Sequence, residues 1–214
     1  MKFSFATTPE GFDNHIKKSI RNYEDLVSDT ITFGNYFIED NTNVYDLGCS
    51  TGRLLHQIKE NQKNIDVNYI GLETCLGFEK FKDIEIHNED IRHWTYQNAS
   101  LITSIFTLQF IPLKDRAKVI ESVYHGLNEG GAFIFAEKIQ MQNSKLHEMM
   151  IFNYYDYKRK HFSEKEILEK EKELRNIMKP VTKKQIEEEL SNWNWRHVDV
   201  FWQSGLFVGY LAIK

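Results

Sequence analysis

Two glycines, Gly48 and Gly52, follow the short apolar stretch 44–47. Glycine lets the backbone turn tightly and lets a ligand approach main-chain atoms, because it has no Cβ. The residues after Gly52 have the apolar spacing of a helix to about residue 62, and the first turn of a helix carries unpaired N–H groups. The segment therefore predicts a strand, a glycine turn and a helix that contact a ligand through the backbone.

Two carboxylates end the next predicted strands. Glu73 follows the strand 67–72, about 20 residues after Gly52, and Asp90 follows the short strand 84–86. At this spacing, the Glu73 carboxylate can accept hydrogen bonds from ribose hydroxyls, and the Asp90 carboxylate can accept one from an adenine amino group. Ligands of open α/β sheets bind outside the carboxyl ends of the strands, so these features predict one crevice. The simpler alternative is that the glycines only form turns and the acids only cap helices.

The glycine motif differs from the dinucleotide fingerprint G-x-G-x-x-G, because Ser50 stands where that motif has its second glycine. Nicotinamide binding is therefore not expected. The pattern D-x-G-x-x-x-G, from Asp46 to Gly52, resembles the first motif of class I S-adenosylmethionine-dependent methyltransferases. Their cofactor has adenine, ribose and an amino-acid tail but no phosphate. The resemblance implies that the glycine turn faces the methionine moiety.

The elements that position these residues alternate between strand and helix. Further strands are predicted at 101–106 and 132–136, the second apolar enough to be buried on both faces, and an amphipathic helix at 117–127. Residues 128–131 are predicted to turn the chain. Repeated strand–helix–strand units predict an α/β, Rossmann-like class I methyltransferase fold with a mostly parallel, seven-stranded sheet.

The chain changes character at residues 143–190, which are helical and strongly charged. Two final strands, near 198–202 and 206–213, are separated by a turn and predict a C-terminal antiparallel hairpin. We therefore expect one domain, 1–214, with a charged helical insertion at 143–190 before the last two strands. Such an insertion is typical of a solvated face or an oligomer contact.

Longer stretches make the resemblance more specific. The run FTLQF at 106–110 is more family-specific than the glycine motif, and it is joined by stretches at 44–50, 90–92, 124–132, 137–138, 156–159, 176–178 and 202–203. The chain thereby resembles the carboxy-S-adenosylmethionine synthase family, whose product serves the modification of wobble uridine in tRNA. The resemblance implies a homodimer, S-adenosylmethionine or carboxy-S-adenosylmethionine as cofactor, and prephenate as carboxyl donor.

The resemblance also implies the site residues. The catalytic candidates are Tyr23, Gln109 and Arg159. The family normally has Asp then Asn where this chain has Glu73 and Thr74, which would hold the ribose with one more methylene. No metal site is expected, because no His/Cys cluster occurs. The cofactor-binding candidates are Tyr23, Asp46, Gly48, Cys49, Ser50, Gly52, Glu73, Thr74, Asp90, Ile91 and Phe106.

Two positions depart from the family. The family has an Asn just before the FTLQF-like run, and this chain has Ile105. The family arginine that reads the extra carboxylate from the neighbouring subunit falls on Glu171. A glutamate repels a carboxylate that an arginine attracts. Lys170, Lys172 or Arg175 could compensate through a shift of up to one helical turn.

Three functions remain open. The first and favoured one is methyl transfer to an unknown acceptor, which needs alignment and exclusion of water rather than covalent help. Its acceptor-side candidates are Tyr23, Gln109, Tyr154, Tyr155 and Arg159. The second is carboxy-S-adenosylmethionine synthesis from prephenate. The third is a non-catalytic, cofactor-binding regulator or partner subunit with 156–190 as its contact surface.

Composition and charge restrict the partners and the compartment. The 214 residues are 41% hydrophobic and 27% charged, as in a globular protein. A net charge of −4 argues against wrapping nucleic acid, although a local basic patch leaves direct binding open. Residues 106–109 also lack the Asn/Asp-Pro-Pro-aromatic motif of amino-directed DNA methyltransferases. Two cysteines, no visible signal segment and no membrane-length apolar run predict a cytoplasmic protein without a membrane partner.

Overall fold

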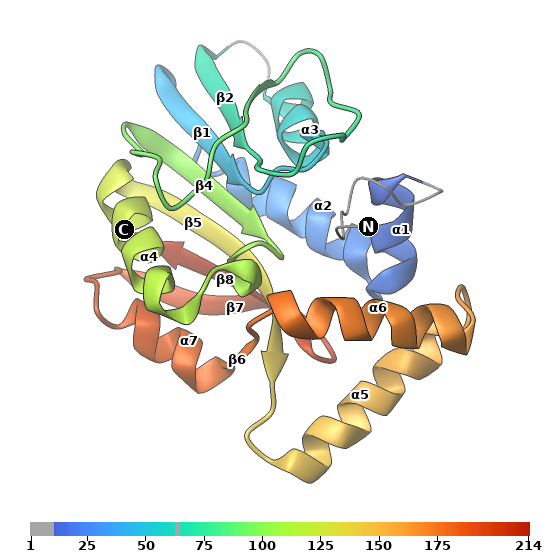
Figure 1. Ribbon diagram of the computed structural model, residues 1–214. Coiled ribbons are helices and arrows are strands. Elements are labelled where there is room, and N and C mark those ends of the chain that lie inside the picture. The colour runs from blue at the N-terminus through green and yellow to red at the C-terminus, as the bar shows by residue number, and fades with distance from the viewer. Residues whose placement is uncertain (1–10, 63–64) are drawn as a thin grey trace.

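A mixed β-sheet forms the centre of the computed structural model, which describes residues 11–62 and 65–214 (Figure 1). Its strand order is β3-β2-β1-β4-β5-β8-β7. The first five of these strands are parallel, and β8 runs antiparallel to both of its neighbours, β5 and β7. The strands are β1 (Thr42–Leu47), β2 (Val67–Leu72), β3 (Glu85–His87), β4 (Ala99–Ile105), β5 (Leu127–Gln140), β7 (His197–Ser204) and β8 (Phe207–Ile213). The predicted fold class is confirmed, and a two-residue strand, β6 (Val181–Thr182), adds one pairing with β5.

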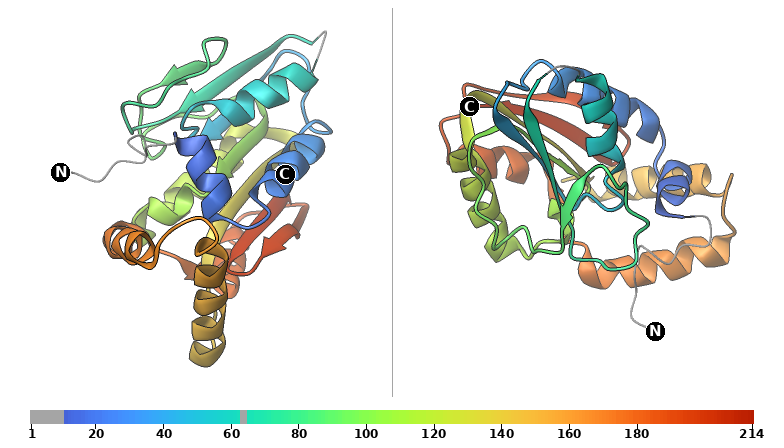
Figure 2. Two further views of the ribbon diagram at one scale, coloured as in Figure 1. Left: turned by 90° about the vertical axis from the view of Figure 1, so that its right-hand side faces the viewer. Right: turned by 90° about the horizontal axis from the view of Figure 1, so that it is seen from above.

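Helices cover both faces of the sheet (Figures 1 and 2). On one face, α2 (Tyr23–Gly34) packs with α3 (Arg53–Asn61), and on the other α4 (Leu113–Gly126) packs with α7 (Lys183–Leu190). The strand residues explain this two-sided burial, because alternate side chains point to opposite faces. Tyr45 and Leu47 join the α4 and α7 layer, whereas Val44 joins Leu55 and Ile58 of α3.

The N-terminal helical region is divided into two helices. The first, α1 (Phe12–Ser19), ends at Ile20, whose backbone is extended, and Asn22, with a φ of 61°, immediately precedes α2. Asparagine tolerates this left-handed conformation better than most residues. The division turns α1 away from α2 and allows it to lie across the carboxyl end of the sheet.

Strand β5 is longer than the sequence predicts, because the expected turn at 128–131 lies within the strand. The Gly130 N–H donates to the Lys214 carbonyl, and the Lys214 N–H donates to the Gly131 carbonyl, each at 3.0 Å. These bonds tie the glycines to the C-terminal residue. Gly130 adopts a φ of 81°, and the β4–β5 register shifts here, so the irregularity is absorbed without leaving the sheet.

The segment 143–190 contains α5 (Ser144–Lys158), α6 (Glu164–Ile177) and α7. Capping boxes begin α6 at Ser163 and α7 at Thr182. In Figures 1 and 2, α5 projects away from the sheet and α6 runs back toward it. Among the described residues, no helix is both long enough and apolar enough to cross a membrane.

Candidate functional site

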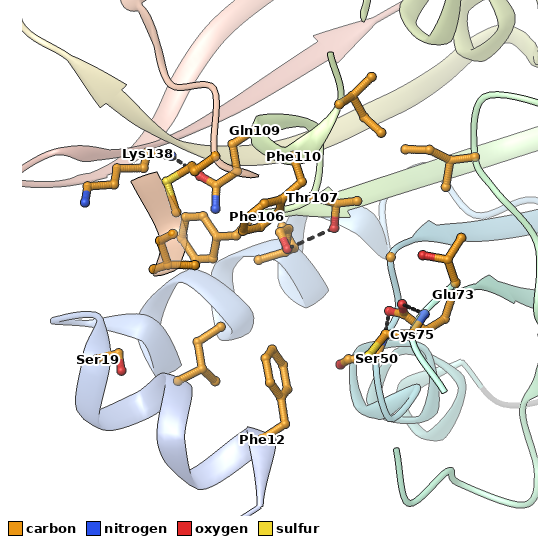
Figure 3. A pocket seen from close by; sticks show the side chains of 18 of the residues that line it. Phe12, Ser19, Ser50, Glu73, Cys75, Phe106, Thr107, Gln109, Phe110 and Lys138 are labelled. Carbon is orange, nitrogen blue, oxygen red and sulfur yellow. Dashed lines mark hydrogen bonds between the residues drawn. The ribbon is translucent and has the colours of Figure 1, made fainter. Parts of the chain in front are cut away.

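A cavity of about 490 Å³ lies at the carboxyl ends of the parallel strands (Figure 3). Its walls come from α1, from the loops that follow β1, β2, β3 and β4, and from β5, α5 and α6. Strand β1 lies between β2 and β4, so the strand order reverses at β1. Open α/β sheets bind ligands at the carboxyl ends of the strands beside such a reversal. The predicted crevice is therefore present.

The glycine turn brings two loops into close contact. Gly48 has a φ of 73°, and a Cβ there would lie 2.3 Å from the Thr107 Oγ1 in the loop after β4. A side chain at this position would therefore separate the two loops. Ser50 and Phe106 in the same loops also adopt positive φ, at 49° and 59°. Such conformations in non-glycine residues store strain and concentrate at functional sites.

The Glu73 carboxylate is fixed by backbone groups at the ribose-type position. Its Oε2 accepts a hydrogen bond from the Ser50 N–H at 3.0 Å, and its Oε1 accepts one from the Cys75 N–H at 2.7 Å (Figure 3). Burial raises the pKa of Glu73, and these N–H groups oppose that rise. Each oxygen retains a lone pair for a further donor. Thr74 lies beside it in the cavity wall.

Asp90 also lines the cavity, but it already has a partner. The Arg92 guanidinium binds its carboxylate at 2.6 and 3.0 Å and holds the pKa of Asp90 below its usual range. The Arg92 N–H donates to the same carboxylate at 2.9 Å. Ile91 between them is buried and lines the cavity. This loop therefore presents an apolar side chain next to an anchored acid.

Helix α1 covers the cavity. The Phe12 ring meets the Phe78 ring of the β2–β3 loop edge to face at 5.3 Å. On the other side, the Tyr157 hydroxyl of α5 donates to the Lys17 carbonyl at 3.2 Å. Helix α1 is thus attached at both ends of its path across the opening.

Two lysines line the end of the cavity opposite Glu73, and Glu171 lies close to one of them without lining the cavity. Lys138 of β5 and Lys158 of α5 line it, with Tyr154, and the Lys138 Nζ is 3.8 Å from the Glu171 Oε1. Figure 3 shows Lys138 and Glu73 on opposite sides. Burial lowers the pKa of Lys138, and it lowers that of Lys158 to about 8, although Glu171 raises both. This end of the cavity is therefore strongly polar and partly dehydrated.

Gln109 connects this lysine end to the FTLQF run. Its side chain is buried, and its Oε1 accepts a hydrogen bond from the Lys138 N–H at 2.8 Å. Its carbonyl accepts one from the Lys179 N–H at 2.6 Å. Gln109 lines the cavity while holding β5 and the end of α6 in place.

Some of the predicted cofactor residues lie in a smaller adjoining cavity of about 40 Å³. Tyr23, Asp46 and Cys49 line it, whereas Gly48 and Ser50 line both cavities. The Asp46 carboxylate accepts a hydrogen bond from the Thr103 hydroxyl at 2.8 Å. Burial raises its pKa to about 7, with Thr103 opposing the rise and Glu73 adding to it.

Two of the predicted site residues do not line either cavity. The Arg159 guanidinium lies at the surface after α5, paired with Asp156 and Glu164. Gly52 is the N-cap residue of α3, and a Cβ there would meet the Ile86 side chain at 2.8 Å, so it permits close packing with β3. Of the acceptor-side tyrosines, Tyr154 lines the main cavity and Tyr155 does not.

Sequence reasoning missed the two buried lysines. Lys138 stands after the apolar, buried part of β5. A charged residue at the end of such a buried run is a signal that could have identified it. Lys158 had no comparable signal, because it ends α5 between the polar residues Asp156 and Arg159.

Comparison with known proteins gives a consistent result, although no family model matches the chain. A carboxy-S-adenosyl-L-methionine synthase from Staphylococcus epidermidis is 36% identical over 220 residues, covering 99% of this chain and 96% of the relative. One from Shewanella sp. (strain ANA-3) is 32% identical over 225 residues, covering 99% and 93%.

Solved structures share the fold at low sequence identity. An S-adenosylmethionine-dependent methyltransferase from Archaeoglobus fulgidus has a TM-score of 0.63 at 12% identity, covering 89% of this chain and 94% of that one. Human N-acetylserotonin methyltransferase in complex with S-adenosylmethionine has a TM-score of 0.55 at 14% identity, covering 89% and 53%. By sequence and fold together, the chain belongs to the carboxy-S-adenosyl-L-methionine synthase family and has the fold of S-adenosylmethionine-dependent methyltransferases.

Proposed function

We propose that this protein binds S-adenosylmethionine in the main cavity and transfers its methyl group to a small acceptor. The observation that carries the proposal is the position of Glu171, whose carboxylate lies 3.8 Å from the Lys138 Nζ at the end of the cavity. A carboxylate there opposes the binding of a second carboxylate on the cofactor. A cofactor without that extra group fits this end better.

The cavity residues fit the parts of this cofactor. The Glu73 carboxylate, held by two backbone N–H groups, would accept hydrogen bonds from ribose hydroxyls. Ile91 offers an apolar surface for adenine beside Asp90, and Gly48 lines the part of the cavity where the amino-acid tail would lie. The bound sulfonium would supply the leaving group. The protein would supply alignment and exclusion of water, with α1 as the cover.

The predicted catalytic residues take different parts in this proposal. Gln109 would hold Lys138 and the FTLQF loop in position through its buried hydrogen bond. Tyr23 lies behind the glycine turn, with its ring centroid 6.3 Å from that of Phe106. Arg159 has surface partners, so we give it no contact with the reacting atoms.

The second candidate is carboxy-S-adenosylmethionine synthesis from prephenate, for wobble-uridine modification in tRNA. The names of the relatives favour it. So does the charge of the lysine end, because Lys138 and Lys158 provide two ammonium groups for the one carboxylate of Glu171. Of the three residues that could replace the family arginine, Lys170 lines the cavity, whereas Lys172 and Arg175 are exposed and do not.

Mass spectrometry of the small molecule retained by the purified protein separates these functions. We expect S-adenosylmethionine or its demethylated product after denaturation. Carboxy-S-adenosylmethionine in the extract would overturn the methyl-transfer proposal in favour of the synthase. The Glu171→Arg variant adds a second test, since a synthase should form the carboxylated species from prephenate in this variant at an equal or higher rate, and a methyltransferase should form none. A stable complex with another protein and no turnover would instead support a regulatory subunit.

We also propose that the protein is a cytoplasmic homodimer that associates through 143–190. The support is the outer surface of α5, where Met149 and Phe152 are each 61% exposed. Leu168 of α6 is also exposed. Large apolar side chains gathered on projecting helices are typical of interaction surfaces.

A further inference from the structure

The Asp90 carboxylate, in the loop after β3, is held by a single arginine. The Arg92 backbone N–H donates to its Oδ1 at 2.9 Å, the Arg92 Nε–H lies 3.0 Å from both oxygens, and Nη2–H donates to Oδ2 at 2.6 Å. An ionised carboxylate accepts about four hydrogen bonds, so these three donors leave one acceptor position. The Asp90 side chain is 25% exposed and lines the main cavity, so a ligand can reach that position.

Arg92 is itself attached to a second element. Its Nη1–H donates to the Asp115 Oδ2 at 3.3 Å, in the first turn of α4. The next residue, Arg116, is fully buried and joins α4 to β5 and α7. The guanidinium of Arg92 therefore connects Asp90 to a firmly packed part of the fold. Its planar fork gives the carboxylate one orientation, which a point charge does not do.

The backbone of the Asp90 loop has attachments that do not involve the Arg92 side chain. The hydroxyl of the buried Tyr96 donates to the Ile91 carbonyl at 3.0 Å, and the His93 N–H donates to the Asp90 carbonyl at 2.9 Å. Replacement of the Arg92 side chain should therefore preserve the course of the loop. It should free only the Asp90 carboxylate to rotate.

We infer that Arg92 is a positioning residue that aims the Asp90 carboxylate at the 6-amino group of the cofactor's adenine, and thereby sets the preference for adenine over a 6-oxopurine. The inference rests on the proposed function, because it takes adenine to lie beside Asp90. An amino group donates to a carboxylate, whereas the oxygen of a 6-oxopurine is an acceptor and is repelled. A 6-oxopurine has a donor at N1 instead, which only a carboxylate free to turn would reach.

Arg92 acts through Asp90 and not on the amino group itself. A guanidinium has only donors, and so does the amino group, so the two cannot form a hydrogen bond. The Nε, Nη1 and Nη2 atoms of Arg92 are already engaged by the carboxylates of Asp90 and Asp115. Arg92 also lowers the pKa of Asp90, so that the carboxylate remains ionised and accepts only.

Calorimetric titration with two ligands tests the inference at pH 7. The first is S-adenosylhomocysteine, and the second is S-inosylhomocysteine, in which an oxygen replaces the adenine amino group. We expect the wild-type protein to prefer the first about tenfold or more. Arg92→Met should lower this preference to about threefold or less, mainly through weaker binding of S-adenosylhomocysteine. Arg92→Lys should keep more of it, because a cation remains beside Asp90. Asp115→Asn should lower it less than Arg92→Met, because Asp90 keeps its bonds from Arg92.

Arg196→Met is the control, because Arg196 is an exposed arginine that lines neither cavity, and its loss should leave both affinities unchanged. Thermal unfolding of each variant identifies a misfolded protein, and Asp115→Asn tests the inference without a change at Arg92. A purely structural role of Arg92, or its direct stacking on the base, would weaken both ligands equally in Arg92→Met.

An unchanged preference in Arg92→Met would therefore overturn the inference. Equal binding of the two ligands by the wild-type protein would also overturn it, although the protein would still bind its cofactor. Failure of the wild-type protein to bind S-adenosylhomocysteine would instead count against the proposed function.

Discussion

At the residue scale, Glu73 joins the loops that follow two neighbouring strands. Its carboxylate accepts from the N–H groups of Ser50 and Cys75, so the group proposed to hold the ribose also fixes the glycine turn. A glutamine has only one acceptor oxygen, and its NH₂ group would face one of these N–H donors. The geometry of the turn thus depends on the charge of this side chain.

Glu73→Gln should therefore weaken S-adenosylhomocysteine binding about ten- to hundredfold, as measured by calorimetry. Glu73→Asp, the residue that the family normally has here, is the matched control and should retain most of the affinity. Unchanged binding in Glu73→Gln would exclude Glu73 as the ribose ligand.

Lys158 predicts a pH dependence at the other end of the cavity. Burial lowers its pKa to about 8, Glu171 raises it, and Lys138 and Lys170 lower it further. The ammonium form attracts a carboxylate, so in the second candidate function the affinity for carboxy-S-adenosylmethionine, measured by calorimetry, should fall as the pH rises from about 7 to about 9. Lys158→Arg should abolish this dependence, because arginine stays charged. A flat profile in the wild-type protein would exclude Lys158 from carboxylate binding.

The lowered pKa of Lys158 also makes the stability of the fold depend on pH, and this dependence has the opposite sign to that of carboxylate binding. Between about pH 8 and the ordinary lysine pKa of 10.5, the unfolded chain holds a proton that the folded Lys158 has lost. The contribution of this residue to the free energy of unfolding should therefore increase with pH across that window. Chemical denaturation of the wild-type and Lys158→Met proteins at both ends of this pH window measures the contribution of Lys158.

At the scale of elements, α1 is a cover held at both ends and by the buried Ile16 between them. The Phe12 ring reaches the β2–β3 loop at Phe78, and Tyr157 holds the opposite end through the Lys17 carbonyl. Removal of the Phe12 ring would leave the Tyr157 bond and the hydrogen bonds from the Thr51 hydroxyl to Asp13 in place, so the cover would lose apolar area without being released.

Phe12→Ala should weaken S-adenosylhomocysteine binding about five- to tenfold, mainly through faster dissociation, because it removes part of the apolar cover. Stopped-flow displacement measures the dissociation rate. Phe33→Ala is a control, since Phe33 is an exposed aromatic residue of α2 that lines neither cavity. An unchanged rate in Phe12→Ala would show that α1 does not limit release.

At the scale of the whole molecule, a buried ion network links α4, β5 and α7. The Arg116 side chain of α4 is fully buried and binds Glu137 of β5 at 3.1 Å and Glu189 of α7 at 2.9 Å. Burial raises the pKa of Glu137, and Arg116 opposes that rise. Since Glu137 precedes Lys138, the network also fixes the strand end that presents Lys138 to the cavity.

Arg116→Met should lower the free energy of unfolding by about 3–5 kcal/mol, because it leaves the Glu137 carboxylate buried without its partner. Chemical denaturation measures the loss. The double variant Arg116→Met with Glu137→Leu should recover much of it, since both charges are then absent. A single variant as stable as the wild-type protein would show that the network contributes little.

The proposed homodimer is also a property of the whole molecule. Sedimentation velocity should give twice the 25.4 kDa chain mass for the wild-type protein. Phe152→Glu should shift it toward the monomer, because it places a charge in the apolar surface of α5. Asn153→Glu, at the exposed neighbouring position, is the control. A monomeric wild-type protein would refute the proposed association.

The sequence alone predicted the fold and a crevice at the carboxyl ends of the parallel strands. Strand and helix periods, the glycine turn at Gly48 and the acids at Glu73 and Asp90 are local signals, and parallel strands necessarily bring their ends together. The prediction failed at 128–131, because hydrogen bonds to Lys214 keep Gly130 and Gly131 in the sheet. No local pattern could anticipate a bond to the opposite end of the chain.

Only the tertiary structure decided the composition of the lysine end. Lys138, Lys158 and Glu171 lie on β5, α5 and α6, and the angle between those elements brings their side chains together. The same angle leaves Arg159, one residue after Lys158, at the surface with Asp156 and Glu164. Adjacent helical residues point about 100° apart, so helix packing, rather than sequence position, determines which charge enters the cavity.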